Sequence, residues 1–547
     1  MILTLQLLMF DQLKISWIDL MIILAYLVLI LVVGILSIRK DKMNSNNYFL
    51  AGRSLNWVLI GCALFASNIS TIHMVGLASA GFSDGIVQGN FEWMASFILI
   101  LLGLVFAPFY FRNKISTLPE FLEKRYNGTA RTLLAVFGII GALFMHIGIS
   151  LYAGAVVFQN FFGIDKWTSI IIISIVTAIY TVYGGLKSVV ITETIQTVIL
   201  LVGAAFLVGY GLHALHENGI HTWADFQQAT KPNQLSLLQT AEQNPKLPWY
   251  SILLGYPVIG IWYWCADQTI VQRVLGAKSL EDARKGPLFA GFLKTLPVFL
   301  MVIPGVMAYV LFRNEINDPN QALPVMITRL LPVGLVGLFS ASLLAALMST
   351  IASALNSAAT LVSIDICKRR NPTMSDQRQV MIGKITAVVV MALSIAWCPM
   401  IERFISIFDA INQILAVLSP PIAAVFVLGV CWKRGNHQGA VSAMVAGIVA
   451  GVLVFLLDFP IIGNQKLITD VMGIPYMMQC WWLFVLCCLV FVIVSKLTPP
   501  PPPEKVQNYT LASPLSFLYG KLTGIGDARI ISLFLLLLMA VLYFIFR

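Results

Sequence analysis

Five charged side chains lie inside stretches of the sequence that are otherwise apolar: Glu92, Glu193, Lys294, Asp365 and Asp409. A charge in hydrocarbon costs free energy, so such residues usually pair with one another, face a water-filled cavity or bind a substrate. Asp365 lies close to the end of its apolar stretch, where its carboxylate can also reach water. Lys294 lies well inside its stretch, and we therefore expect it to take part in binding.

Uncharged polar residues interrupt a further apolar stretch near residues 55–80. The segment CALFASNISTIHMVG carries Ser67, Asn68, Ser70, Thr71 and His73. A continuous membrane helix gains nothing from such a cluster, whereas an unwound segment that lines a cavity can use it. We therefore expect the helix to break here.

A second break is expected in the segment SILLGYPVIGIWYWCADQ, within the apolar stretch at 248–272. Gly255, Pro257 and Gly260 lie in its middle, and these residue types favour unwinding of a membrane helix. Two broken helices at corresponding positions of two halves indicate an inverted-repeat transporter that binds its substrate near the bilayer midplane. The alternative is a pair of kinked helices without a function.

A stripe of small and hydroxyl residues follows one face of a predicted helix. Ala346, Ser349, Thr350 and Ser353 are spaced i, i+3, i+4 and i+7. Such residues also mediate ordinary helix packing in membranes. Opposite an unwound segment, however, hydroxyls and freed carbonyls supply the hard oxygen ligands that a small cation requires.

The composition agrees with a membrane transporter. Of the 547 residues, 59% are hydrophobic and 11% are charged, which excludes a soluble enzyme. The net charge of +10 comes from basic residues in short loops, which form no basic stripe of the kind that binds nucleic acid. The sequence contains no GxxxxGK[ST] phosphate loop, so uphill transport must use an ion gradient or another subunit.

Fourteen apolar stretches approach the ~20 residues that a helix needs to cross a bilayer. They lie near 16–38, 55–80, 90–111, 129–162, 166–183, 186–212, 248–272, 287–313, 333–367, 380–401, 404–430, 437–458, 477–496 and 528–546. The first is too long for the apolar region of a signal peptide and is expected to remain as a span. If the N-terminus is outside, the inner loops and the adjoining span ends contain 25 of the 35 Lys and Arg residues, so we expect both termini outside.

Three other features receive simpler interpretations. The eight cysteines lie in or beside apolar stretches and form neither a disulfide framework nor a paired CxxC site. His213, His216 and His221 have no second ligand cluster, so a metal site there is the minor alternative to an ordinary polar loop. The run Pro499–Pro503 is interpreted as a stiff spacer, with recognition by a proline-binding partner as the alternative.

Eight segments together indicate a family. They are YFLAGRSLNW (48–57), ASNIS (66–70), FEWMA (91–95), STLPEFLEKRYN (116–127), YGGLKSV (183–189), WYWCADQTIVQRVLGAK (262–278), LNSAATL (355–361) and SPPIAAVFVLGVCWKR (419–434). On these segments the chain resembles the solute/sodium symporter family, most closely its sodium/glucose cotransporter branch.

The resemblance implies an all-α polytopic membrane protein with the five-plus-five inverted repeat of LeuT-type transporters. In this chain a single transporter domain would cover residues 1–547. It would comprise an extra N-terminal span at 16–38, a first repeat at 55–212, a second repeat at 248–430 and accessory spans at 437–546.

The resemblance also implies site residues. Sodium would be the coupling ion, and no further cofactor is implied. The ion would bind the carbonyls of Ala66, Ile69 and Ala346 and the hydroxyls of Ser349 and Thr350. Sugar would bind Asn68, His73, Glu92, Trp262, Tyr263, Trp264, Lys294 and Asn412, with Leu77, Phe91 and Phe408 as an outer gate and Tyr263 as an inner gate. This set suits a pyranose, because polar groups can meet its hydroxyls while an aromatic ring meets its CH face. An interfacial belt is the alternative explanation of the Trp and Tyr cluster.

The chain departs from the family pattern at positions that bear on the sugar and on the ion count. Asn412, beside Gln413, aligns with a family glutamine, and Gly260 stands where some bacterial members carry an amide. Family members that move two sodium ions use an Asp where this chain has Glu193, and a hydroxyl where it has Ala352. A second sodium site at Glu193 and Ser353 is therefore the alternative to a single coupled ion.

We expect a sodium-coupled symporter that imports a neutral monosaccharide across a bacterial inner membrane by alternating access, with the ion, the sugar and the lipid bilayer as its partners. The absence of an N-x-[ST] acceptor from the outer loops is the basis for the bacterial assignment. Within the family the alternatives are inositol, sialic acid, another small carboxylate, an amino acid or a vitamin. A polytopic membrane enzyme and a transport-like sensor are remote alternatives.

Overall fold

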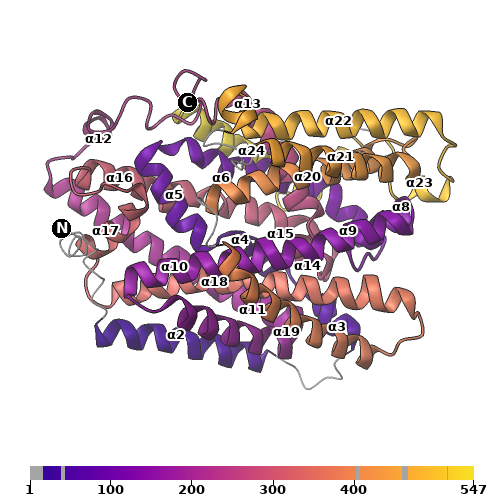
Figure 1. The fold of residues 1–547 in the computed structure, drawn as a ribbon, viewed down its shortest axis with the longest axis horizontal. Helices are drawn as coiled ribbons and strands as arrows, with labels where there is room; N and C mark the ends of the chain where they lie inside the picture. Colours follow the sequence, from indigo (N-terminus) through magenta and orange to yellow (C-terminus); the bar gives the residue numbers. More distant parts are fainter. Residues whose placement is uncertain (1–15, 38–43, 402–406, 459–465, 514) are drawn as a thin grey trace.

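The computed structural model describes residues 16–37, 44–401, 407–458, 466–513 and 515–547. Side chains at 72, 160–162 and 407–413 are also outside the described set. Apart from one isolated bridge between Leu55 and Ala277, all regular structure in these ranges is helical. The long helices run side by side, roughly parallel to the long axis of the molecule (Figure 1). This arrangement agrees with the expected all-α membrane protein.

Eleven helices in the described part of the chain are long and apolar enough to cross a membrane, or up to twelve if the bent pair α4–α5 is one span. The long elements are α2 (Trp17–Leu36), α4 (Trp57–Asn68), α5 (Thr71–Ser83), α6 (Asn90–Leu101) with α7 (Ala107–Arg112), α9 (Gly128–Ile140) with α10 (Ser150–Phe162), α11 (Lys166–Glu217), α13 (Trp249–Gly260), α15 (Leu280–Leu293) with α16 (Ile303–Phe312), α18 (Leu335–Thr360), α19 (Asp376–Ile401), α20 (Ile407–Cys431), α21 (His437–Asp458), α22 (Tyr476–Leu497) and α24 (Ala528–Ile545). Short helices join them: α3 (Ser45–Leu50), α8 (Leu118–Arg125), α12 (Trp223–Ala229), α14 (Gln268–Leu275), α17 (Ala322–Leu330) and α23 (Glu504–Gln507). The expected number of fourteen spans stays a prediction.

The number of membrane spans depends on whether α11 is counted as one span or as two. Its 52 residues would extend about 78 Å as one straight helix, more than twice the ~30 Å of bilayer hydrocarbon. Gly185 interrupts it with φ 59° and ψ −158°, a backbone conformation that glycine adopts readily. On either side of this residue, Tyr180 donates to the carbonyl of Met348 (3.3 Å), and the carbonyl of Ile199 accepts from Ser342 (2.9 Å). Both halves therefore pack on α18, as two spans joined by a tight turn would.

The first expected break is confirmed. Helix α4 ends at Asn68, α5 begins at Thr71, and the two helices meet at an angle of 62°. Ile69 between them has an extended backbone, with φ −78° and ψ 113°. The polar cluster of the sequence therefore lies at the interruption.

The second expected break lies elsewhere than at Gly255–Gly260, so that expectation is wrong. Helix α13 is continuous to Gly260 and passes into a π-helical turn, η6 (Ile261–Ala266). The chain leaves helical geometry at Asp267, whose carboxylate caps α14 by accepting from the backbone N–H of Thr269 at 2.9 Å. The glycines serve packing instead, since a Cβ on Gly255 would lie 2.3 Å from the carbonyl oxygen of Met477 in α22.

The start of α2 and the end of α24 lie at the same face of the helix bundle. At the start of α2, Asp19 accepts from the backbone N–H groups of Gly334 (2.8 Å) and Gly337 (2.7 Å). At the end of α24, the carbonyl of Phe546 accepts from Leu237 at 2.8 Å. The start of α2 and the end of α24 both lie in the left half of Figure 1. The loops around α8 and α23 form the opposite face, at the right of the same view.

Candidate functional site

A cavity of about 180 Å³ lies at the two breaks, among α4, α5, α6, α13 and the end of α15. Polar and aromatic side chains line most of it. Its lining comprises Asn68, Ser70, His73, Leu77, Gln88, Phe91, Glu92, Met145, His146, Ser150, Tyr256, Ile259, Gly260, Tyr263, Trp264, Lys294, Thr350 and Leu415. Eight of the predicted substrate and gate residues are thereby brought together from distant parts of the sequence.

An ion pair between Glu92 and Lys294 forms one wall of the cavity. Both residues are almost completely buried, with 2% and 1% of their surface exposed. Lys294 also donates to the side-chain oxygen of Asn68 at 2.5 Å. Because Lys294 is the residue after α15 and Asn68 is the last residue of α4, this contact joins the first break to the second half of the chain.

His73 is oriented by the start of its own helix. Its Nδ1 lies 2.9 Å from the hydroxyl of Ser70 and 3.3 Å from the backbone N–H of Ser70. Since the backbone N–H can only donate, Nδ1 accepts, and a neutral ring therefore carries its proton on Nε2. His73 lines the cavity beside Asn68, so it offers a donor to a ligand.

Aromatic rings form the apolar part of the cavity. Tyr263 and Trp264 lie edge to face with centroids 5.1 Å apart, and the Lys294 ammonium lies 5.8 Å from the Trp264 ring centroid. Phe91 packs against Tyr256 in the same manner at 5.8 Å. Trp262 does not line this cavity. It faces a separate small cavity with Asp267, because successive residues of a helix point in different directions.

The predicted gate is only partly described. Leu77 and Phe91 line the cavity as expected, and so does Tyr263. The side chains of Phe408 and Asn412 lie outside the described residues.

Several lining residues were not predicted from the sequence. Gln88, Ser150 and His146 add polar groups, and His146 is bound through Nε2 to the carboxylate of Asp267 at 3.0 Å. His146 is a lone histidine in an apolar stretch, and this unusual setting was the one signal that pointed to it. The others have ordinary sequence surroundings.

Oxygen atoms of α4 and α18 meet directly beside the first break. The hydroxyl of Ser349 donates to the carbonyl of Ala66 at 2.8 Å, and the hydroxyl of Thr350 lies 3.2 Å from the carbonyl of Ser67. Both hydroxyls also reach the carbonyl of Ala346, at 3.0 and 3.2 Å. These contacts join four of the five predicted sodium ligands; Ile69 is completely buried, and no described hydrogen bond places its carbonyl among them. A cluster of carbonyl and hydroxyl oxygens is suited to a hard cation such as sodium.

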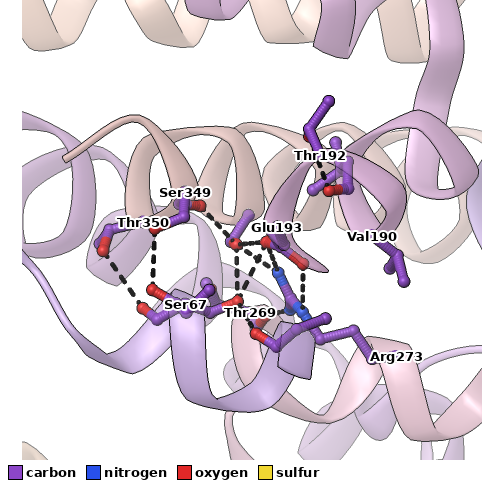
Figure 2. A network of polar contacts seen from close by, with 12 residues as sticks. Ser67, Val190, Thr192, Glu193, Thr269, Arg273, Ser349 and Thr350 are labelled. Atoms are coloured by element: carbon purple, nitrogen blue, oxygen red, sulfur yellow. Dashed lines mark hydrogen bonds and ion pairs between the residues drawn. The ribbon is translucent and has the colours of Figure 1, made fainter. Parts of the chain in front are cut away.

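A second polar network lies one helical turn further along α18 (Figure 2). Glu193 of α11 is paired with Arg273 of α14, at 2.5 Å from Oε1 to Nη2 and 3.1 Å from Oε2 to Nε. Ser353 contacts both side chains, and Ser67 donates to Glu193 at 3.0 Å. Glu193 and Ser353, the two residues expected at a second sodium site, are thus in contact. The carboxylate of Glu193 is already paired with the guanidinium group of Arg273.

The remaining charges of the apolar stretches are accounted for separately. Asp365 accepts from Arg131 at 2.7 Å and from Thr117 at 2.8 Å, near the end of α18. The side chain of Asp409 lies outside the described residues. His216 and His221 contact each other at 2.8 Å, but the described residues contain no group of three His, Cys, Asp or Glu side chains that could hold a metal ion.

Comparison with known proteins gives consistent matches. The model of the sodium:solute symporter family matches residues 48–447. Sodium/glucose cotransporter 1 of Oryctolagus cuniculus is 33% identical over 479 residues, which cover 81% of this chain and 72% of that protein. Sodium/myo-inositol cotransporter 2 of the same species is 35% identical over 472 residues, which cover 81% and 70%.

Solved structures show the same fold. A substrate-bound, outward-open sodium-coupled sialic acid symporter matches with a TM-score of 0.75 and 22% identity, covering 89% of this chain and 99% of that one. Mhp1, a nucleobase-cation-symport-1 family transporter, matches with a TM-score of 0.54 and 15% identity, covering 86% and 98%. These likenesses confirm the expected fold class, a multi-pass helical transporter of the LeuT type.

The family match extends over most of the chain, and the cotransporters align with more than two thirds of their own length. Both findings exclude the alternative of a polytopic membrane enzyme. The chain belongs to the sodium:solute symporter family.

Proposed function

We propose that this protein imports a neutral monosaccharide, glucose-like or galactose-like, together with sodium by alternating access. The main support for the proposal is the geometry of the last turn of α4. There the carbonyls of Ala66 and Ser67 meet the hydroxyls of α18, and the side chain of the next residue, Asn68, lines the cavity. One turn of helix therefore serves both the cation and the substrate.

The cavity lining supports a sugar as the substrate. Glu92 supplies acceptors, Lys294 supplies donors, and Tyr263 supplies an aromatic face for the CH surface of a pyranose. The charges of Glu92 and Lys294 balance each other, which favours a neutral ligand over an anion. We include Asn412, Trp262 and the outer gate residue Phe408 in the proposed site on the family resemblance alone.

The second candidate is a cyclic polyol such as inositol. It presents the same hydroxyl groups as a pyranose, and relatives that match at 35% identity are sodium/myo-inositol cotransporters. Uptake by proteoliposomes, with and without an imposed sodium gradient, tests both candidates. We expect sodium-driven uptake of labelled glucose or galactose; uptake of labelled inositol alone would replace the first candidate by the second, and uptake of neither would refute the proposal.

We propose that both termini lie outside and that the face around α8 and α23 is cytoplasmic. The loops of that face and the adjoining helix ends contain most of the Lys and Arg residues, which supports this orientation. The bacterial inner membrane is part of the same proposal.

The sodium site generates the first prediction. Replacing both hydroxyls, with Ser349→Ala and Thr350→Val, removes two oxygen ligands at a cost of about 1–3 kcal/mol. We expect the sodium concentration for half-maximal uptake to rise about tenfold or more. Ser340→Ala is the matched control, because this α18 hydroxyl binds only Val336 of its own helix among the described contacts. Unchanged sodium dependence in the double variant would place the cation elsewhere.

The ion pair generates the second prediction. Lys294→Met leaves Glu92 buried without its partner, which costs about 3–5 kcal/mol and lowers stability as well as sugar binding. The double variant Lys294→Met with Glu92→Gln removes both charges and should recover thermal stability in detergent while sugar uptake stays abolished. Normal sugar uptake by the double variant would show that the pair has a structural role only.

The pairing of Glu193 with Arg273 generates the third prediction. We propose one coupled sodium ion per sugar, because the carboxylate at the second site is neutralised by a guanidinium and Ala352 lacks a hydroxyl. One ion that crosses about 100 mV contributes about 2.3 kcal/mol. A tenfold sodium gradient adds about 1.4 kcal/mol, so the sugar can accumulate several hundredfold.

The reversal potential of the sugar-coupled current in proteoliposomes measures this ratio. We expect a value that corresponds to one positive charge per sugar. A value that corresponds to two charges would restore Glu193 and Ser353 as a second sodium site.

A further inference from the structure

A second, larger cavity of about 710 Å³ lies at the face proposed to be cytoplasmic. Its walls are the end of α7, the first turns of α15 and the segment 507–529 that leads into α24. This segment is anchored to the bundle: Asn113 donates to the carbonyl of Asn508 at 3.0 Å, and Leu511 donates to Val430 at 2.8 Å. The cavity is therefore a built feature, separate from the site described above.

Four basic side chains and two carboxylates line this cavity: Arg112, Arg284, Lys521, Arg529, Glu281 and Asp527. The carboxylates already have partners. Asp527 accepts from Arg529 at 2.7 and 2.9 Å, and this hydrogen bonding holds the pKa of Asp527 well below its usual range. Glu281 is paired with Lys285 at 2.5 Å.

Arg529 has a structural role, since it also donates to the carbonyls of Leu518, Gly520 and Lys521 at 2.9–3.0 Å. Arg112, Arg284 and Lys521 differ: within the described ranges no hydrogen bond or ion pair is found for their side-chain nitrogens. The Nε of Arg284 is buried without any partner. A buried guanidinium N–H without an acceptor is costly, so Arg284 is suited to bind an added acceptor. Arg112 and Lys521 contribute two exposed cationic groups to the same cavity.

The rest of the lining is mixed: polar side chains of Asn113 and of the segment before α24 lie beside a group of apolar residues. Leu104, Val105, Pro108 and Phe109 form the apolar part of the lining. The adjacent segment also exposes large apolar side chains: Leu515 (53%), Tyr519 (70%), Leu522 (54%) and Ile525 (81%). Exposed apolar residues beside basic ones, at the ends of membrane helices, are typical of a segment that lies in the bilayer interface.

We propose that this cavity binds the phosphate headgroup of an anionic phospholipid of the inner leaflet. The phosphodiester would accept from Arg112, Arg284 and Lys521, for which planar guanidinium groups are well suited. The acyl chains would lie against Phe109 and the exposed apolar side chains of 515–525. A free phosphate ester shares the headgroup chemistry but leaves this apolar surface uncovered, which is why we assign the lipid.

Native mass spectrometry of the purified full chain tests the assignment with phosphatidylglycerol, with phosphatidylcholine and with glycerol 3-phosphate as a soluble competitor. We expect phosphatidylglycerol to bind at least about tenfold more tightly than phosphatidylcholine. The variant Arg112→Gln with Arg284→Gln should lose this preference. Arg378→Gln, which alters an exposed arginine of the same face outside the cavity, should retain it.

Arg284 is half-buried, so its replacement can affect folding. The variant Arg112→Gln with Lys521→Gln changes two exposed residues only, and it should weaken phosphatidylglycerol binding by about tenfold. Equal binding of the two lipids, or an unchanged preference in this variant, would overturn the proposal. Displacement of the lipid by millimolar glycerol 3-phosphate would assign the site to soluble phosphate esters instead. None of these results depends on which solute the protein carries.

Discussion

The interruption between α4 and α5 determines how the neighbouring helices must pack. A helix that ends inside a membrane leaves backbone carbonyls without partners, and hydrocarbon supplies none. In this protein the carbonyls of Ala66 and Ser67 are met by the hydroxyls of Ser349 and Thr350. The same oxygens can ligate a cation. The groups that pair with the end of the broken helix are therefore also the groups that can bind sodium. The position of α18 against α4 follows from it.

The buried charges follow the same logic. Glu92 with Lys294, and Glu193 with Arg273, each join helices from the first and second halves of the chain. Removal of one member of such a pair is expensive because the remaining charge stays in a medium of low dielectric constant. The first pair borders the cavity and is available to a substrate. The second pair does not line this cavity, and the hydroxyls of Ser67 and Ser353 donate to its carboxylate (Figure 2). The surroundings of the first pair therefore suit substrate binding, and those of the second pair suit charge balance within the helix bundle.

Much of the site could be predicted from residue types, because polar residues in hydrocarbon have few structural explanations. The break at Asn68 is of this kind. The convergence of Glu92, Lys294 and His73 was implied by the family resemblance instead. The second break was misplaced, since the sequence does not show that Gly255 faces the backbone of α22 while Asp267 caps a new helix. Arg273 lies beyond the apolar stretch, so only the three-dimensional structure reveals that it reaches Glu193. The lone His146 could have been noticed, but its partner Asp267 could not.

We infer that sodium at the α4–α18 site stabilises the sugar site through the last turn of α4. By thermodynamic linkage, sodium must then raise the affinity for the sugar as much as the sugar raises the affinity for sodium. Isothermal titration of the purified protein with the transported sugar, in sodium and in choline, measures this coupling most directly. We expect the dissociation constant of the sugar to be about tenfold or more lower in sodium, and this difference to be lost when the Ser349 and Thr350 hydroxyls are removed. Equal affinity in the two salts would contradict it.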